Sequence, residues 1–217
     1  VAPCEEPAPD DPNVWTDGSL TSSMPPFGAG GFGIWFPDRC PLTVGLNELT
    51  FGQVVDVGPI HGSGGVAIAG AMLEPFPSST RCEIAGMLSC ISAPHPVHIA
   101  TDSANAAGIA NQLLSGHGHR RPIQLRSDGD LWQAFLDACT AKGPGAVRVS
   151  WTKGHVTLAQ IMRGDQSPRA AILNSIADKA ADLSAFSEAQ VATQERAHDS
   201  SAGGEDVSET PRWSDDD

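Results

Sequence analysis

The residues Val14–Ser19, VWTDGS, place the strongest constraint on the fold, because an apolar segment leads directly into a single acidic residue, Asp17. Valine, tryptophan and threonine favour extended strands, and Gly18 favours a turn. We therefore expect a strand over 14–17 that ends at its own carboxylate. An aspartate at a strand end is most often only a turn former, so Asp17 becomes informative only if other acidic residues fold to the same place.

Patterns typical of strands and helices alternate along most of the chain. Strands are expected at 14–17, 31–36, 66–73, 97–101 and 147–151, and helices at 78–92, 103–114, 130–142 and 169–186. A hairpin-like start followed by strand–helix alternation indicates the α/β class, with a mixed sheet flanked by helices. The strands that end at Asp17 and Asp102 can then lie parallel and adjacent, with both carboxylates at the sheet edge where such folds bind ligands.

The two ends of the chain differ in composition from its centre. Residues 1–12 are rich in proline and acid and have no apolar face, so we expect them to be disordered or extended. Residues 188–217 are polar and acidic, and we expect a disordered tail there. The remaining 13–187 suits one domain of ordinary size. Within it, 37–65 fits no regular pattern beyond a hint of a short strand near Val54, and we expect an insertion.

The net charge of −13 would oppose binding to nucleic acid if it were spread evenly. However, residues 1–12 hold four acids and no base, and residues 188–217 hold nine acids and two arginines. The centre is therefore nearly neutral, and a bound pair of divalent cations would more than cancel its remaining charge. Binding to a polyanion is not excluded for the central domain.

Cysteine content and hydropathy predict the compartment. No apolar run is long enough to span a bilayer, and no basic-then-apolar leader precedes the domain. The five cysteines are odd in number and scattered, without a CxxC pair, so neither a zinc site nor a disulfide framework is indicated. We expect an intracellular protein of the nucleus or cytoplasm that is not secreted and has no membrane partner. Because the first residue is Val1, we also expect a piece of a longer chain.

Four acidic residues stand in places from which they can meet. Asp17 and Asp102 each end a strand, Glu83 lies in the first turn of a helix, and Asp178 lies in the last helix, one turn after Asn174. Mg²⁺ prefers oxygen ligands, chiefly carboxylates. Two such ions about 4 Å apart can activate a water and stabilise the leaving oxygen of a phosphodiester. Without the cations, carboxylates this close would raise one another's pKa. The pattern therefore predicts a site for two divalent cations.

Each acidic residue also has a simpler interpretation. Asp17 can be only a turn former, and Asp102 can cap the next helix. Glu83 can complete a capping box that begins at Thr80. Asp178 can be a solvated charge on a helix face.

A loop histidine, His155 in the segment TKGH, follows the strand at 147–151. Such a residue is most often only exposed. Because imidazole titrates near neutral pH, His155 can also serve in proton transfer or ease the departure of product.

Five short segments resemble the successive motifs of the ribonuclease H family, type 1. They are TDGS (16–19), TRCEIAGML (80–88), ATDSANA (100–106), WTKGH (151–155) and NSIAD (174–178). Each segment says little alone, but five in this order, each on the expected element, form a specific pattern. The resemblance covers roughly residues 13–186.

This resemblance implies a ribonuclease H-like fold, with a five-stranded mixed sheet flanked by helices. It implies an endonuclease that cuts the RNA strand of an RNA–DNA hybrid using two Mg²⁺ or Mn²⁺ ions. The residues that it places at the site are the metal-binding and catalytic carboxylates Asp17, Glu83, Asp102 and Asp178, the catalytic loop histidine His155, and the substrate-binding positions Gly18, Ser19 and Asn174. Backbone groups near Gly18 can contact the 2′-OH that distinguishes RNA, since glycine lets the chain come close.

The sequence departs from the family pattern in two respects. The stretch 37–65 lengthens the connection between the first two carboxylates, and the strongly basic helical handle with which some members grip the hybrid is not evident. The corresponding region holds only His117, His119, Arg120, Arg121 and Arg126. Arg120 and Arg121 are candidates for phosphate contacts, with an ordinary solvated loop as the alternative. Weak affinity would call for a partner module, such as a retroelement reverse transcriptase in the same parent chain.

Two other functions stay open. The first is a catalytically weak or inactive ribonuclease H-like module that binds or tethers nucleic acid within a larger polyprotein. The second is an integrase or exonuclease of related fold. Those enzymes use other carboxylate spacings and lack the pairing of WTKGH with NSIAD.

Overall fold

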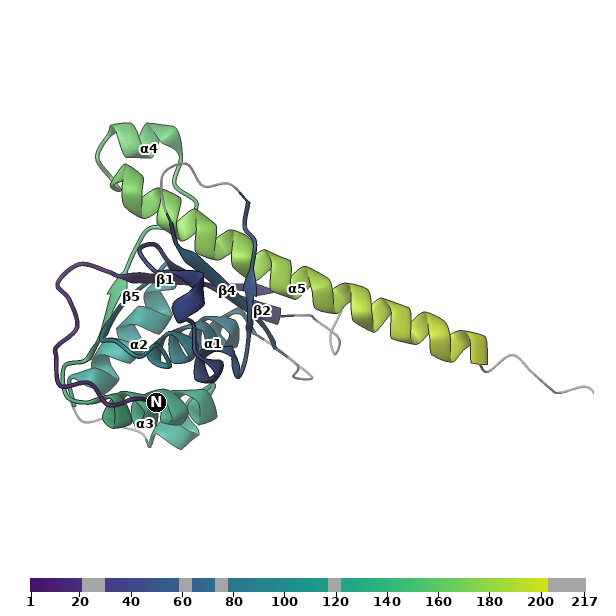
Figure 1. Cartoon of the computed structure of the whole chain (residues 1–217), viewed down its shortest axis with the longest axis horizontal. Coiled ribbons are helices and arrows are strands. Elements are labelled where there is room, and N and C mark those ends of the chain that lie inside the picture. Colours follow the sequence, from purple (N-terminus) through teal and green to yellow (C-terminus); the bar gives the residue numbers. More distant parts are fainter. Residues whose placement is uncertain (21–29, 59–63, 73–77, 117–121, 203–217) are drawn as a thin grey trace, which may run out of the picture.

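The computed structural model describes residues 1–20, 30–58, 64–72, 78–116 and 122–202, with the backbone alone for 186–202. At its centre lies a six-stranded sheet in the order β3-β4-β2-β1-β5-β6 (Figure 1). The strands are β1 (Val14–Leu20), β2 (Gly30–Phe36), β3 (Gln53–Val55), β4 (Val66–Met72), β5 (Val97–Thr101) and β6 (Val147–Trp151). The strands β3, β4, β2 and β1 pair antiparallel, whereas β5 is parallel to both β1 and β6. The sheet is therefore mixed, as the sequence predicts.

Helices cover both faces of the sheet (Figure 1). They are α1 (Ser79–Ile91), α2 (Ala104–Leu114), α3 (Gly129–Lys142), α4 (Leu158–Met162) and α5 (Pro168–Ala202), with short 3-10 helices at Pro41–Thr43, Leu46–Leu49 and Ile123–Leu125. One core joins α1, α2 and α3 to a sheet face that includes Val14 and Phe32. A second core joins α5 to the opposite face, over Trp15 and Trp35. Neighbouring residues of β1 thus serve different cores, as the pleat of a strand requires.

The packing of α5 on β2 depends on glycines that leave room for a helix backbone. A Cβ atom on Gly33 would overlap the carbonyl oxygen of Ala177 and the nitrogen of Ala181, and one on Gly31 would overlap Oγ of Ser184. Both alanines of α5 are fully buried. The helix therefore lies directly on the backbone of the strand, which fixes where its polar residues reach the sheet edge.

In the sequence, Ile172, Ile176, Ala180 and Leu183 recur at helical spacing and predict an apolar stripe on α5, but only two of these four residues are buried. Ile176 and Ala180 are buried, but Ile172 and Leu183 are 53% and 42% exposed. Small side chains fit against the glycines of β2 better than large ones do, so the buried face of α5 is rich in alanines, with Leu173 and Ile176 beside them.

The region 37–65, predicted as an insertion, contributes β3 and raises the strand number from the expected five to six. A buried ion pair between Arg39 and Glu48 holds its first half together. Farther along, Nζ of Lys179 on α5 donates a hydrogen bond of 2.5 Å to the carbonyl oxygen of Val57. Val57 itself is buried in the α5 core. The region is thus built into both the sheet and the core.

The lead, residues 1–12, has no regular secondary structure, but it is bound to the domain. The backbone N–H groups of Cys4 and Ala8 donate to the carbonyl oxygens of Lys142 and Gly145 at 2.7 and 2.8 Å. Ala8 is buried. Of the two states that the composition predicts, the structure shows the extended one, because these backbone groups find partners beside the start of β6.

The C-terminal helix is longer than the sequence predicts. α5 continues to Ala202 and projects beyond the sheet (Figure 1). The tail predicted to be disordered over 188–217 is therefore helical as far as Ala202, and its last residues, 203–217, lie outside the described part of the chain. Among the described helices, none combines the length and apolar character that a membrane crossing needs.

Two helix starts also differ from the expected caps. The sequence pattern indicates Ser79 or Thr80 as the start of α1, but Oγ of Ser78 accepts the hydrogen bond from the backbone N–H of Arg81 and caps the helix. Ser127 and Asp130 have the spacing of a capping box in the sequence, but the box does not form, since Asp128 stands at the N-cap of α3 with a φ of +58°. The Asp130 carboxylate instead pairs with the Arg81 guanidinium at 2.8 Å. Asp130 therefore forms an ion pair with a residue of another helix and does not take part in that capping box.

Replacing Gly33 by alanine should destabilise the domain, because the new methyl group would overlap the backbone of α5. Overpacking of this kind typically costs about 1–3 kcal/mol. The matched control is Gly108→Ala on the exposed side of α2, where nothing lies within 4 Å of the added carbon. There alanine should stabilise the helix by up to about 1 kcal/mol. Urea titrations that gave both variants the same free energy of unfolding would contradict the packing.

Candidate active site

The first acidic residue, Asp17, lies in the middle of β1 and not at its end, because β1 continues to Leu20 by pairing with β2. The parallel neighbour β5 stops earlier, with Thr101 opposite Thr16. In the described part of the chain, no strand pairs with that side of β1 beyond Thr16. The Asp17 carboxylate is 5% exposed and accepts a hydrogen bond of 2.8 Å from the N–H of Gly18. Another element can therefore reach it past the end of β5.

Helix α1 is that element, and it brings Glu83. A Cβ atom on Gly18 would lie only 2.7 Å from the Glu83 nitrogen, so the missing side chain allows α1 to approach β1. Glu83 is 6% exposed, and its Oε2 accepts a hydrogen bond of 3.0 Å from Oγ1 of Thr101. Because Ser78 caps the helix, the capping box beginning at Thr80 is wrong.

Asp102 follows β5, and the loop after β6 holds it in place. Nε1 of Trp151 donates to the Asp102 carbonyl oxygen at 3.0 Å. A Cβ atom on Gly154 would overlap the Asp102 carboxylate, so the loop backbone lies directly against that group. The parallel, adjacent arrangement of β1 and β5 that the sequence predicts is confirmed.

These three residues, far apart in the sequence, form a cluster. Asp17, Glu83 and Asp102 each offer one oxygen, and the three oxygens lie within 4.8 Å of one another. Two oxygens on opposite sides of one Mg²⁺ are roughly 4 Å apart, since each bond is about 2.1 Å long. The cluster is therefore close to the dimensions of a shared cation site.

Asp178 and His155 lie beside this carboxylate cluster on its more open side. The charge of Asp178 acts on Asp17 and Asp102, but Asp178 is not one of the three grouped residues. Nδ1 of His155 is 3.9 Å from Oδ2 of Asp178, and the histidine side chain is 79% exposed. His155 also has a φ of +47°, which is uncommon for a residue with a side chain.

The three positions that the resemblance implies as substrate-binding make contacts within the protein. Gly18 faces α1. Oγ of Ser19 donates to Oδ1 of Asp182 at 2.6 Å, and Ser19 is half-buried. Asn174 is 3% exposed, and its Nδ2 donates to Oδ2 of Asp102 at 3.4 Å. The glycine thus serves helix packing and the asparagine orients a carboxylate, while Ser19 keeps partial access to solvent.

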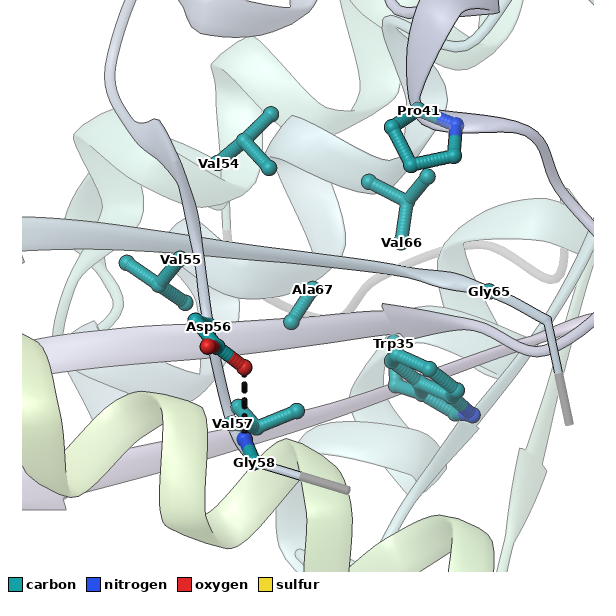
Figure 2. Close-up of a pocket in the computed structure, with 10 residues that line it drawn as sticks. All are labelled: Trp35, Pro41, Val54, Val55, Asp56, Val57, Gly58, Gly65, Val66 and Ala67. Atoms are coloured by element: carbon teal, nitrogen blue, oxygen red, sulfur yellow. Dashed lines mark hydrogen bonds between the residues drawn. The ribbon is translucent and has the colours of Figure 1, made fainter. Parts of the chain in front are cut away.

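A separate pocket of about 460 Å³ lies beside β3 and β4 (Figure 2). Its lining is mainly apolar and includes Trp35, Val54 and Val66. Asp56 is its one carboxylate, and that group accepts a hydrogen bond from the N–H of Gly58 (Figure 2). None of the clustered acidic residues lines this pocket, so the pocket and the carboxylate cluster lie in different parts of the molecule.

The fold of this chain resembles the folds of three solved structures. The PFV RNase H domain matches with a TM-score of 0.53 at 20% identity, over 80% of this chain and 93% of that one. LC9-RNase H1, a type 1 RNase H with the type 2 active-site motif, matches with a TM-score of 0.52 at 17% identity, over 85% and 75%. The chain has a ribonuclease H-like fold. The Prototype Foamy Virus protease-reverse transcriptase matches with a TM-score of 0.51 at 20% identity, over 85% of this chain and 22% of that one.

No protein-family model and no curated protein matches the sequence. At 17–20% identity, the likeness concerns the fold alone. The ribonuclease H-like fold inferred from the five motifs is thus confirmed, with six strands in place of five.

The carboxylate cluster lies in a buried part of the molecule. Burial, followed by the charges of Asp102 and Asp178, raises the pKa of Asp17 to about 7. Burial, followed by the charges of Asp17 and Asp102, raises the pKa of Glu83 to about 9. Burial and the charge of Asp182 also raise the pKa of Asp178. Without a cation, Asp17 and Glu83 therefore keep their protons to a higher pH than ordinary carboxyl groups do.

The chemistry of these donors fits a divalent metal ion. Carboxylate oxygens are the ligands that Mg²⁺ and Mn²⁺ prefer, and a bound cation reverses the repulsion among them. Beside the cluster, Oδ1 of Asn174 is a buried oxygen without a hydrogen-bond partner among the described residues. Asp17, Glu83 and Asp102 would hold one ion, with Asp178 available as a further ligand.

Sequence reasoning did not single out three residues of this site: Thr101, Trp151 and Gly154. They lie inside the motifs ATDSANA and WTKGH, and that position is the one signal that could have found them. Their partners, Glu83 and Asp102, belong to other elements. The contacts therefore follow from the fold and not from any local pattern.

In EDTA, the stability of the domain should fall as the pH rises. Below the ordinary pKa values of 3.8 and 4.5, Asp17 and Glu83 are protonated in both states and contribute nothing. Between these ordinary pKa values and about pH 9, the folded state retains protons that the unfolded state releases. The free energy of unfolding therefore declines across this range. Glu83→Gln should flatten this decline and be more stable than the wild type at pH 9. Urea titrations across this range test the expectation, with Asp137→Asn on the exposed side of α3 as the control. A flat wild-type profile would contradict it.

Proposed function

We propose that this domain is a metal-dependent endonuclease that hydrolyses the RNA strand of RNA–DNA hybrids. The observation that carries the proposal is the meeting of Asp17, Glu83 and Asp102, from three separate elements, beside the carboxyl end of β5 in a ribonuclease H-like sheet. Like charges gathered in a buried place destabilise a fold unless something binds them. A divalent cation is the ligand that best fits an all-carboxylate set.

The cofactors would be two Mg²⁺ or Mn²⁺ ions, held by Asp17, Glu83, Asp102 and Asp178. When bound, such ions lower the pKa of water and stabilise the leaving oxygen of a phosphodiester. The chain supplies the positions: the first three carboxylates are fixed by their hydrogen bonds to Gly18, Thr101 and Asn174. Asp178, with its side chain 33% exposed, is left accessible.

His155 is suited to proton transfer at the open side of the site. Its imidazole is exposed, lies 3.9 Å from the Asp178 carboxylate, and sits in a loop held against Asp102 through Gly154. From that position its ring nitrogens can take up or deliver a proton as product leaves. No other described histidine has an ion-pair contact with one of the four acidic residues.

A hybrid substrate is favoured because the fold is that of RNase H domains and the site suits phosphodiester chemistry.

Affinity for the hybrid would be modest, since most basic side chains in the described part of the chain already have partners within it. Lys153, beside Gly154, is the one described Lys or Arg without an ion pair or hydrogen bond, and it can contact a phosphate. Arg120 and Arg121, the candidates from the sequence, lie outside the described residues.

A further module would therefore help to hold the substrate. The match to the Prototype Foamy Virus protein, a protease-reverse transcriptase, covers only 22% of that chain. We propose a reverse transcriptase or another module of the same parent chain as the partner. A higher affinity for hybrid in a longer chain than in this domain would support this arrangement.

Asp102→Asn should abolish cleavage of a labelled RNA–DNA hybrid in Mg²⁺. The loss should exceed the roughly 10- to 100-fold that removing an outer-shell partner costs, because Asp102 is proposed to hold the ion directly. Asp137→Asn, a neutralised carboxylate on the exposed face of α3, should cleave like the wild type. Duplex DNA in parallel reactions separates this activity from that of an integrase or exonuclease. A wild-type protein that binds Mn²⁺ but leaves the hybrid intact would favour the inactive, tethering module instead.

His155→Ala should lower kcat while KM changes little, since the exposed imidazole is proposed to move a proton and not to hold substrate. General acid–base groups contribute about 10²-fold or more, so a loss of that order is expected, smaller than the loss in Asp102→Asn. Steady-state cleavage rates at several hybrid concentrations give both constants. A variant whose KM rose while kcat stayed unchanged would show a binding role and contradict the proposal.

A further inference from the structure

Each carboxylate of the cluster has one of its two oxygens already occupied by a hydrogen-bond donor of the protein. The pairs are the Gly18 N–H to Asp17 Oδ1 at 2.8 Å, the Thr101 hydroxyl to Glu83 Oε2 at 3.0 Å, and the Asn174 amide to Asp102 Oδ2 at 3.4 Å. One oxygen of each residue is thereby held, and each of the three residues offers one oxygen to the cluster. The three contacts together define which way the carboxylates face.

The contact from Thr101 differs from the other two because it joins α1 to the end of β5 through a fully buried hydroxyl. Thr101 is 0% exposed. Its Oγ1 accepts a hydrogen bond of 3.2 Å from the N–H of Ser103. That contact uses a lone pair of the oxygen and leaves the hydroxyl proton for Glu83. Ser103 in turn caps α2 by accepting from the N–H of Ala106.

We propose that Thr101 is a positioning residue for Glu83, which sets the orientation of that carboxylate towards a divalent cation. The inference rests on the proposed function only in taking Glu83 as a metal ligand. Thr101 does not touch the ion or the substrate. It acts by holding Oε2, which fixes the direction in which the Glu83 carboxylate faces the neighbouring acidic residues.

The competing explanation is that Thr101 only fills space in the core. The two explanations predict different results for two substitutions. Valine keeps the branched shape and loses the hydroxyl, whereas serine keeps the hydroxyl and loses a methyl group. A space-filling residue would tolerate valine better than serine, and a positioning residue would show the reverse.

The test is calorimetric titration of the whole domain with Mn²⁺, in the absence of nucleic acid. Thr101→Val should bind Mn²⁺ about 10- to 100-fold more weakly than the wild type, the range typical of lost outer-shell partners. Thr101→Ser should bind with nearly the wild-type affinity. Urea unfolding in EDTA shows whether each variant is folded, and Thr101→Ala, which also lacks the hydroxyl, replaces the valine variant if that one does not fold.

A double-mutant cycle assigns the effect to Glu83. In a Glu83→Gln background, replacing Thr101 by valine should cause little further loss of Mn²⁺ affinity, because the oriented carboxylate is already gone. Equal losses in the two backgrounds would overturn the proposal, as would a serine variant that binds as weakly as the valine variant, or a valine variant that binds like the wild type.

The two proposals fail in different ways. If the wild type binds Mn²⁺ and shows the Thr101 dependence but does not cleave a hybrid, the proposed activity is wrong and the positioning role stands. If the wild type cleaves a hybrid and Thr101→Val both binds and cleaves normally, the positioning role is wrong and the activity stands. If the wild type binds no Mn²⁺, both are wrong.

Discussion

The close approach of two helices to the central strands is the constraint on which the site depends. On one face, Gly18 lets the backbone of α1 contact β1, and on the other face Gly33 lets α5 contact β2. A single methyl group at either position would push a helix away. Since α1 carries Glu83 and α5 carries Asp178, the missing side chains determine where two of the four carboxylates can lie.

Because the helices lie so close to the sheet, the carboxylates are buried and near one another, and their charged forms are destabilised. Desolvation and mutual repulsion raise the pKa values of Asp17 and Glu83, and nearby His155 takes a backbone conformation uncommon for its type. Features of this kind concentrate where a fold is organised around a ligand and not around its own stability. Hydrogen bonds from Thr101 and Asn174 hold the acidic groups in orientations that repulsion alone would not select.

The outline of the fold was predictable because its elements follow local rules. Strand and helix patterns from Val14 onward depend on residues close together in the chain, and the structure confirms the elements that they predict. Predictions failed where a distant partner decided the outcome. The Asp130 carboxylate pairs with the Arg81 side chain and does not complete a capping box, and the first strand continues past Asp17 because it pairs with β2. Composition carries no information on such partners.

For the site, the sequence by itself determined the identity and order of the acidic residues, their places on strands and helices, and the motifs that resemble ribonuclease H. Only the tertiary structure decided that Asp17, Glu83 and Asp102 share one small space, that Gly18 serves helix packing, and that a buried threonine holds the glutamate. The reason is physical. Periodicity and capping act over a few residues, whereas a hydrogen bond between α1 and the end of β5 exists only after the sheet has brought them together.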